Sequence, residues 1–280
     1  MTNAGTTTQP LPDPELDAVL AEIENIPDFQ GKTAGVIRKA IDNVLQGDRT
    51  RRYSISQLTP EEKKHIGTQV ERGLKSDFFQ DRAGKVSDTT IADVEVDIKN
   101  TIGDNWMIPP EAVGRLCLLT QIDEKSAKYS VGLIRARDEL LGKENQDKKK
   151  SFSKEGRKSI SWIVKDASLP VSAFLISPPT IRDGIFEKSS GQARVTELFR
   201  QIQAAPIHRS DIEAVAATKD RQVDVRARVR DAKTKLHQEG LLVLRGWNRV
   251  ENDEARRRGY PIDRKQCISI PLQNRPDTPK

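Results

Sequence analysis

Charged residues stand at alternate positions of the segment 93–99 (DVEVDIK), where Asp97 is followed two residues later by Lys99. Residues two apart on a β-strand share a face, so these two side chains are expected to point into one space. Asp88 lies nine residues before Asp97, a distance that allows a strand, a tight turn and a return strand. Carboxylates can hold a hard cation that lowers the pKa of a bound water, and a nearby lysine can position that water. The pattern is compatible with metal-assisted hydrolysis of a phosphodiester.

The ligand set is not fixed by this pattern alone. Asp93 and Glu95 lie on the same predicted strand face as Asp97 and are rival ligands. Glu71, on a predicted helix, could reach the same space from below the sheet. The alternative is a strand face that is simply solvated. The motif, an acidic residue followed by Asp-x-Lys, is short and occurs by chance in many charged proteins.

The elements that position these residues follow from hydrophobic periodicity. Thr59, Pro60 and Glu62 form a capping box that predicts the start of a helix with Ile66, Val70 and Leu74 on its apolar side. From about residue 85 the apolar period changes to two, which is typical of strands. The first half is therefore predicted to be mixed α/β, with helices at 13–25 and 33–46 and after residue 59, and strands around 93–99, 113–121 and 128–136.

The second half is more basic than the first. Residues 151–280 carry 25 Lys/Arg and 16 Asp/Glu, whereas the first 150 residues carry 22 and 25. A basic half suggests contact with a polyanion, although a solvated basic surface is an equally simple interpretation. The polar segment 142–158, which includes Lys148-Lys149-Lys150, is interpreted as an exposed linker. The predicted organisation is a domain over 10–145, a charged linker over 146–160 and a second domain over 161–280.

Three helical patterns followed by two apolar strands end the chain. The apolar stripes of the three helices contain Leu198, Val215 and Val229. A capping box formed by Ser210 and Glu213 is predicted to begin the second helix, and Gly240 is predicted to end the third. This order predicts a mainly α winged helix-turn-helix domain, with Arg256-Arg257-Arg258 in a long wing loop. On the third helix, side chains away from the apolar stripe are candidate DNA contacts: Arg221, Gln222 and Arg226 for bases, and Arg230 and Lys233 for phosphate.

Five blocks of sequence resemble the NaeI restriction endonuclease family. They keep the family's order and approximate spacing from about residue 30 to 245, which is far more specific than any one motif. The blocks are Thr33-Ala34-Gly35-Val36, Gly67-Thr68-Gln69-Val70-Glu71, Val96-Asp97-Ile98-Lys99, Trp106-Met107-Ile108-Pro109-Pro110-Glu111 and Gly191-Gln192-Ala193-Arg194-Val195-Thr196-Glu197-Leu198-Phe199-Arg200.

The resemblance implies a first domain with a nuclease fold of the PD-(D/E)xK class. It implies that Asp88 and Asp97 bind Mg²⁺, that Lys99 orients the attacking water and that Glu71 supports metal binding. Two positions depart from the class pattern: Ser87 precedes Asp88 where proline is common, and the second acid is aspartate, as it is in the family.

The resemblance also implies a homodimer that cuts double-stranded DNA at a palindromic, GC-rich site. We expect the cut to leave 5′-phosphate and 3′-hydroxyl ends. The second domain would resemble the DNA-binding fold of catabolite activator proteins and act as an effector domain that binds a second copy of the site and activates cleavage. No nucleotide cofactor is expected.

The chain shows no run of about 18–20 apolar residues and no secretion signal, so a cytoplasmic protein without membrane contact is expected. Cys117 and Cys267 lie far apart in apolar runs and are interpreted as buried thiols. Two alternatives stay open: a winged-helix transcription regulator without catalysis, and a repair or recombination nuclease that recognises DNA structure.

Overall fold

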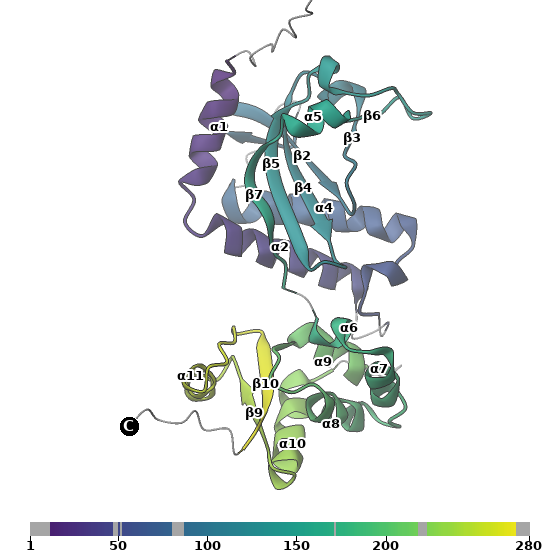
Figure 1. Ribbon diagram of the computed structural model, residues 1–280, viewed down its shortest axis with the longest axis vertical. Helices are drawn as coiled ribbons and strands as arrows, with labels where there is room; N and C mark the ends of the chain where they lie inside the picture. The colour runs from purple at the N-terminus through teal and green to yellow at the C-terminus, as the bar shows by residue number, and fades with distance from the viewer. Residues whose placement is uncertain are drawn as a thin grey trace, which may run out of the picture. The chain divides into compact units, whose positions relative to one another are not determined.

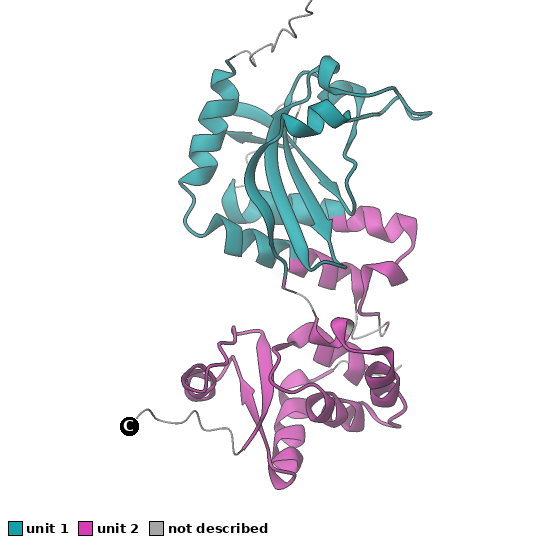
Figure 2. Cartoon of the chain, viewed as in Figure 1, with its two compact units in different colours: residues 1–37, 67–169 teal, residues 38–66, 170–280 magenta. Residues whose placement is uncertain are grey.

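The computed structural model of the chain divides into two compact units (Figure 2). Unit 1 consists of residues 1–37 and 67–169, and unit 2 of residues 38–66 and 170–280. The residues that the structure describes are 12–46, 50, 52–79, 87–170, 172–217 and 223–272. Helices α2 (Phe29–Leu45) and α4 (Pro60–Phe78) each continue from one unit into the other.

Unit 1 is built around a five-stranded mixed sheet of order β1-β2-β4-β5-β7 (Figure 1). Strands β2 and β4 are parallel, and every other neighbouring pair in the sheet is antiparallel. The prediction of a mixed α/β first half is confirmed. The strands are β1 (Thr89–Ile91), β2 (Val94–Thr101), β4 (Leu116–Asp123), β5 (Lys128–Arg135) and β7 (Ser161–Ser168).

Helices α1 (Pro14–Glu24), α2 and α4 accompany this sheet (Figure 1). The capping box predicted for α4 is present, because Glu62 N donates to Thr59 Oγ1 at 3.3 Å and Thr59 N donates to Glu62 Oε2 at 2.9 Å. Helices α2 and α4 approach so closely that a Cβ at Gly73 would stand 2.6 Å from Val36 Cγ1. The Tyr129 hydroxyl ties β5 to α2 by donating to the Gln30 carbonyl at 2.5 Å.

The segment predicted as a linker over 146–160 contains regular structure. Strand β6 (Lys150–Ser151) pairs with β3 (Met107–Ile108), and β7 pairs with β5. Unit 1 therefore extends to residue 169, later than the sequence predicted. The physical reason is that Phe152 and Ile160, isolated in a polar stretch, are buried in a core cluster of unit 1. Short helices η2 (Pro110–Ala112), η3 (Asp138–Leu140) and α5 (Lys154–Lys158) complete this region.

Unit 2 combines helices with a three-stranded antiparallel sheet of order β8-β10-β9. Its core is formed by the predicted stripes, including Leu198, Val215 and Val229, which are fully buried. The elements are η1 (Ile55–Gln57), α6 (Ala173–Ile176), α7 (Pro179–Phe186), α8 (Gly191–Gln201), β8 (Ile207–His208), α9 (Arg209–Ala216), α10 (Val225–Gln238), β9 (Leu241–Arg245), α11 (Arg249–Arg257) and β10 (Gln266–Pro271).

Two details of unit 2 differ from the sequence predictions. The capping box of α9 is formed by His208 and Asp211 rather than by Ser210 and Glu213. The connection between β9 and β10, expected to be a long loop, contains α11, whose N-cap Asn248 accepts a hydrogen bond from Glu251 N at 3.1 Å. The predicted end of α10 is confirmed, since Gly240 adopts a φ of 80°.

Neither a membrane-spanning helix nor a disulfide is present among the described residues. No described helix is both long and apolar enough to cross a bilayer. Cys117 and Cys267 are buried free thiols, as predicted, and burial raises the pKa of Cys117 to about 12. Burial raises the pKa of Cys267 as well, so both thiols stay protonated and uncharged near neutral pH.

Candidate active site

Asp97 and Lys99 share one face of β2, as the alternation of the strand predicts. Lys99 Nζ lies 3.8 Å from Asp97 Oδ1. The Asp97 side chain is only 8% exposed, and its strand β2 lies between β1 and β4 in the sheet. In the parallel pair of β2 and β4, Asp97 is in register with Cys117, whose neutral thiol adds no charge. The predicted wet face of β2 is thus mostly enclosed at this point.

Asp88 is brought to the same place by the β1–β2 hairpin. The turn of this hairpin is Ala92-Asp93, and both residues have positive φ, 49° and 62°. Asp88 immediately precedes β1, and the return strand β2 brings two donors to its side chain. The backbone nitrogen of Ile98 donates to Asp88 Oδ2 at 2.7 Å, and Lys99 Nζ lies 3.5 Å from the same oxygen. The prediction of strand, tight turn and return strand is confirmed, and the backbone of β2 itself orients Asp88.

Glu71 reaches this group from α4. The pKa of Glu71 is raised, first by burial and then by the negative charge of Asp88, while Lys75 and Lys99 act in the opposite direction. Lys75 Nζ lies 3.8 Å from Glu71 Oε1. The four residues named from the sequence, Glu71, Asp88, Asp97 and Lys99, are therefore near one another in unit 1.

The electrostatics of the group favour an added positive charge. Burial raises the pKa of Asp97, Asp88 raises it further, and the ammonium of Lys99 opposes both effects. Carboxylates that crowd one another in a half-buried place are those that gain most from a bound cation. Their oxygens are the donors that Mg²⁺ prefers. Within the described ranges, however, no three His, Cys, Asp or Glu side chains already stand at metal-binding distances. The donor chemistry fits Mg²⁺, and binding would require the carboxylates to draw together.

The two rival acids are placed differently. Asp93 lies in the hairpin turn and is exposed, whereas Asp88, Asp97 and Lys99 gather further along the strands. Glu95 belongs to β2 and pairs with Thr90 of β1. The geometry thus separates Asp93 from the group, while Glu95 stands two residues before Asp97 on the same strand.

Arg115 is a member of the site that the sequence did not reveal. It immediately precedes β4, and its positive charge lowers the pKa values of Asp97 and Cys117. Its proximity depends on the parallel register that pairs Val96 with Leu116. A single sequence carries no signal for a register between strands twenty residues apart.

Comparisons with known proteins agree with this geometry. A family model described as "Restriction endonuclease NaeI" matches residues 19–272. The type II restriction enzyme NaeI of Lentzea aerocolonigenes is 35% identical over 268 residues, covering 91% of this chain and 82% of that enzyme. This chain belongs to the NaeI restriction endonuclease family. The resemblance seen in the five sequence blocks is confirmed, and family membership implies a nuclease that cuts DNA at specific sites.

In this NaeI-family chain, the residues of unit 2 that were predicted to contact DNA differ in their exposure and ion pairing. Arg226 and Arg230 of α10 are exposed, and Arg230 pairs with its neighbour Asp231 at 3.1 Å. Lys233 is engaged by Glu251 of α11 at 2.6 Å, which competes with the predicted phosphate contact. Arg221 and Gln222 lie outside the described residues.

Trp106, which the sequence left open as a cleft or a packed corner, is buried. Its Nε1 donates to the carbonyl oxygen of Thr120 at 2.9 Å, and only 2% of its surface is exposed. This block of the NaeI family resemblance therefore contributes to the core at this residue, whereas its neighbour Met107 is 47% exposed.

Proposed function

We propose that this chain is a Mg²⁺-dependent type II restriction endonuclease that hydrolyses double-stranded DNA and leaves 5′-phosphate and 3′-hydroxyl ends. The observation that carries the proposal is the meeting of Asp88, Asp97 and Lys99 in unit 1, with Lys99 Nζ 3.5 Å and 3.8 Å from the two carboxylates. Membership of a restriction endonuclease family supplies the substrate class.

In this proposal, Asp88 and Asp97 hold Mg²⁺ and Glu71 supports its binding. When bound, Mg²⁺ lowers the pKa of a coordinated water and offsets the negative charge of the phosphate. The hydrogen bond from Ile98 N fixes Asp88 relative to β2, so the two aspartates keep a common orientation. The raised pKa values of Glu71 and Asp97 describe carboxylates whose charge is poorly compensated by the protein alone.

Lys99 has two roles in the proposed reaction. Its ammonium group donates hydrogen bonds, so it can orient the attacking water toward phosphorus. It also offsets negative charge that develops on the phosphate oxygens as the bond to the 3′ oxygen breaks. Burial of the lysine stem, with the side chain 21% exposed, restricts where its ammonium can point.

Unit 2 is proposed to be the winged-helix DNA-binding domain, with α10 as the helix that contacts DNA. Support comes from the order α8, α9, α10 and the sheet that follows, together with exposed Arg226 and Arg230. Arg221 and Gln222 precede α10 and are included as predicted base contacts. Lys233 is proposed as a phosphate contact only if its ion pair with Glu251 opens.

The assembly is proposed to be a homodimer acting on a palindromic, GC-rich site, with activation by a second copy of that site. A two-fold symmetric dimer is the simplest reader of a two-fold symmetric sequence. This part of the proposal is drawn from the family resemblance.

The proposed function is tested by incubating the purified protein with unmethylated phage DNA, in Mg²⁺ or in EDTA, beside the variant Asp97→Ala. Discrete bands that require Mg²⁺ and disappear in the variant are expected, and sequencing the ends gives the site and end chemistry. Bands from branched or mismatched DNA only would favour a structure-specific nuclease. DNA that is bound but uncut under both conditions would sink the catalytic proposal and favour a regulator.

A further inference from the structure

A hairpin arm projects from unit 1 over residues 141–152, within the segment that the sequence suggested to be a linker (Figure 1). Its base is closed by a bridge between Leu141 and Phe152 and by Gly142 N, which donates to the Ser151 carbonyl at 2.8 Å. Near its tip, Asn145 N donates to the Lys149 carbonyl at 2.9 Å. The arm is therefore an antiparallel hairpin.

The tip of the arm is built by Asn145 and presents two lysines. Asn145 Oδ1 accepts hydrogen bonds from Asp147 N and Lys149 N, each at 2.9 Å. Lys148 adopts a left-handed φ of 58°, which is uncommon for a residue with a side chain. Lys148 and Lys149 are exposed, and neither has an ion-pair partner within the described parts of the chain. Lys150, by contrast, pairs with Asp138 at 2.6 Å.

The base of the arm is anchored on the sheet face that carries the candidate active site. Leu141 and Phe152 belong to one core cluster with Cys117. Cys117 is the register partner of Asp97 in the parallel pair β2–β4, and partners in register point to the same side of a sheet. The cluster under the arm therefore packs on the face from which Asp97 and Lys99 project.

We infer that the 141–152 arm clamps the DNA that is being cut, with Lys148 and Lys149 contacting backbone phosphates. The inference rests on the proposed function for its substrate and adds a contact surface within the catalytic unit. Two unpaired ammonium groups on an ordered tip match a polyanion that lies along the face of Asp97 and Lys99. Phosphate contacts strengthen binding at any sequence and do not select bases.

The test compares two double variants that remove the same charge from unit 1. Lys148→Ala/Lys149→Ala removes the tip lysines, and Lys125→Ala/Lys128→Ala removes two exposed lysines near the β4–β5 turn. Cleavage of phage DNA is followed at several DNA and KCl concentrations. The arm variant should raise KM about tenfold at unchanged kcat and reduce the salt dependence of KM by about two in log–log slope. The control should match the wild type. An unchanged KM in the arm variant, or equal changes in both, overturns the inference.

A second measurement separates failure of the arm from failure of the proposed function. An amine-reactive reagent is applied to the wild type with and without phage DNA in EDTA, and modified lysines are quantified by mass spectrometry. Lys148 and Lys149 should be protected by DNA more than Lys125 and Lys128. Protection without Mg²⁺-dependent cutting would keep the arm as a DNA contact and sink the catalytic proposal. Normal cutting without protection would sink the arm alone.

Discussion

Two buried aspartates, one in each unit, show how differently a protein can treat the same group. Asp97 of unit 1 is 6% exposed and Asp211 of unit 2 is 3% exposed. Burial is the first cause of a raised pKa in both, and it brings the pKa of Asp211 to about 6. The difference lies in what surrounds each carboxyl group.

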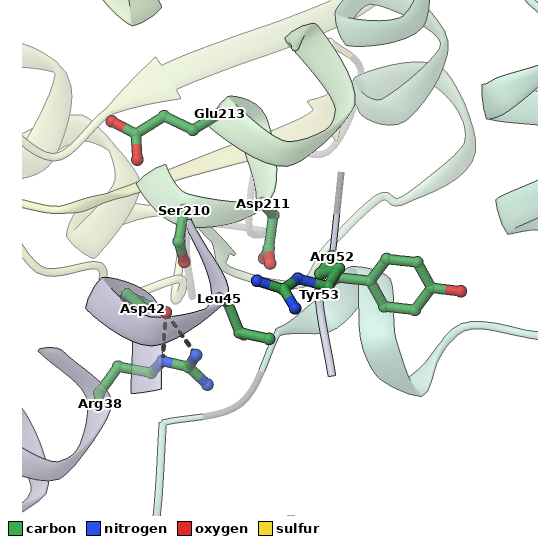
Figure 3. Close-up of a pocket in the computed structure, with 8 residues that line it drawn as sticks. All are labelled: Arg38, Asp42, Leu45, Arg52, Tyr53, Ser210, Asp211 and Glu213. Carbon is green, nitrogen blue, oxygen red and sulfur yellow. Dashed lines mark hydrogen bonds and ion pairs between the residues drawn. The ribbon is translucent and has the colours of Figure 1, made fainter. Parts of the chain in front are cut away.

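Asp211 is enclosed by groups that satisfy it. Its Oδ2 accepts a hydrogen bond from His208 N at 3.2 Å as part of the cap of α9, and Ser172 provides a further hydrogen bond. It lines a small pocket together with Arg38 and Asp42, which pair with each other (Figure 3). These contacts describe a structural carboxyl group that begins a helix and completes a buried polar network.

Asp97 is instead surrounded by competing charges. Asp88 raises the pKas of both Asp97 and Glu71, and the cations Lys99 and Arg115 offset the charge of Asp97. Carboxylates clustered beside a lysine fit the metal site proposed above, whereas Asp211 meets hydrogen-bond donors within its own unit. Burial and a raised pKa therefore do not by themselves mark a functional residue; the further carboxylates and the lysine gathered around Asp97 are what distinguish it from Asp211.

The largest expected effect is loss of DNA cleavage when a proposed Mg²⁺ ligand beside Asp97 is replaced. Asp88→Asn should reduce the Mg²⁺-dependent cleavage rate by on the order of 10³-fold, because one anionic oxygen ligand is removed at unchanged size. Asp93→Asn is the matched control, since Asp93 is exposed in the adjacent turn and should cut at nearly the wild-type rate. Initial rates on phage DNA measure both. Equal losses in the two variants would show that the hairpin, not the Asp88 carboxylate, is what matters.

Replacing Asp211 is expected to change the free energy of unfolding, an effect smaller than the loss of cleavage in Asp88→Asn. The Asp211 pKa of about 6 in the folded protein exceeds the usual 3.8, so the folded state holds the proton more tightly. The unfolded chain loses its proton first as pH rises, and Asp211 therefore lowers stability by about 2 kcal/mol between pH 4 and 7. Asp211→Asn removes this contribution and keeps an oxygen acceptor for His208 N.

Urea unfolding of wild type and Asp211→Asn at pH 4 and pH 7 measures the difference. The variant should gain stability relative to the wild type as pH rises, while its cleavage rate stays close to that of the wild type. His208, Arg38 and Asp42 lie near the same carboxyl group and are present in both proteins, so the wild-type to variant difference reports on Asp211. A difference in stability that does not change with pH would show that Asp211 is ionised throughout this range.

The local parts of the structure were predictable from sequence. The capping box of Thr59 and Glu62 and the alternation of β2 each depend on contacts within a few residues, so their patterns are written in consecutive sequence. The hairpin that returns Asp88 to Lys99 follows from the same short-range logic. The roles of the four candidate residues stay predictions until cleavage is measured.

The non-local parts were not predictable in the same way. Helices α2 and α4 cross between the two units, and Arg115 reaches the site through strand register, which no single segment encodes. The 142–160 region reads as a polar linker because its anchors are only two apolar residues, Phe152 and Ile160, whose burial depends on tertiary packing. Sequence patterns of this kind report local periodicity, whereas a few isolated side chains can hold a long segment in place.

The smallest effect on DNA cleavage is expected at Glu71, the carboxylate that approaches the group from α4. Glu71 is proposed to support the metal rather than to dominate its binding, since it approaches from α4 while Asp88 and Asp97 are fixed by β2 and its hairpin. Glu71→Gln should therefore raise the Mg²⁺ concentration for half-maximal cleavage by about tenfold and leave the rate at saturating Mg²⁺ nearly unchanged. Glu62→Gln, on the first turn of the same helix, is the control and should leave the Mg²⁺ requirement unchanged. Cleavage rates across a Mg²⁺ titration decide the matter. A lower rate that excess Mg²⁺ does not restore would place Glu71 among the groups that act in the reaction itself, and a wild-type titration would remove it from the site.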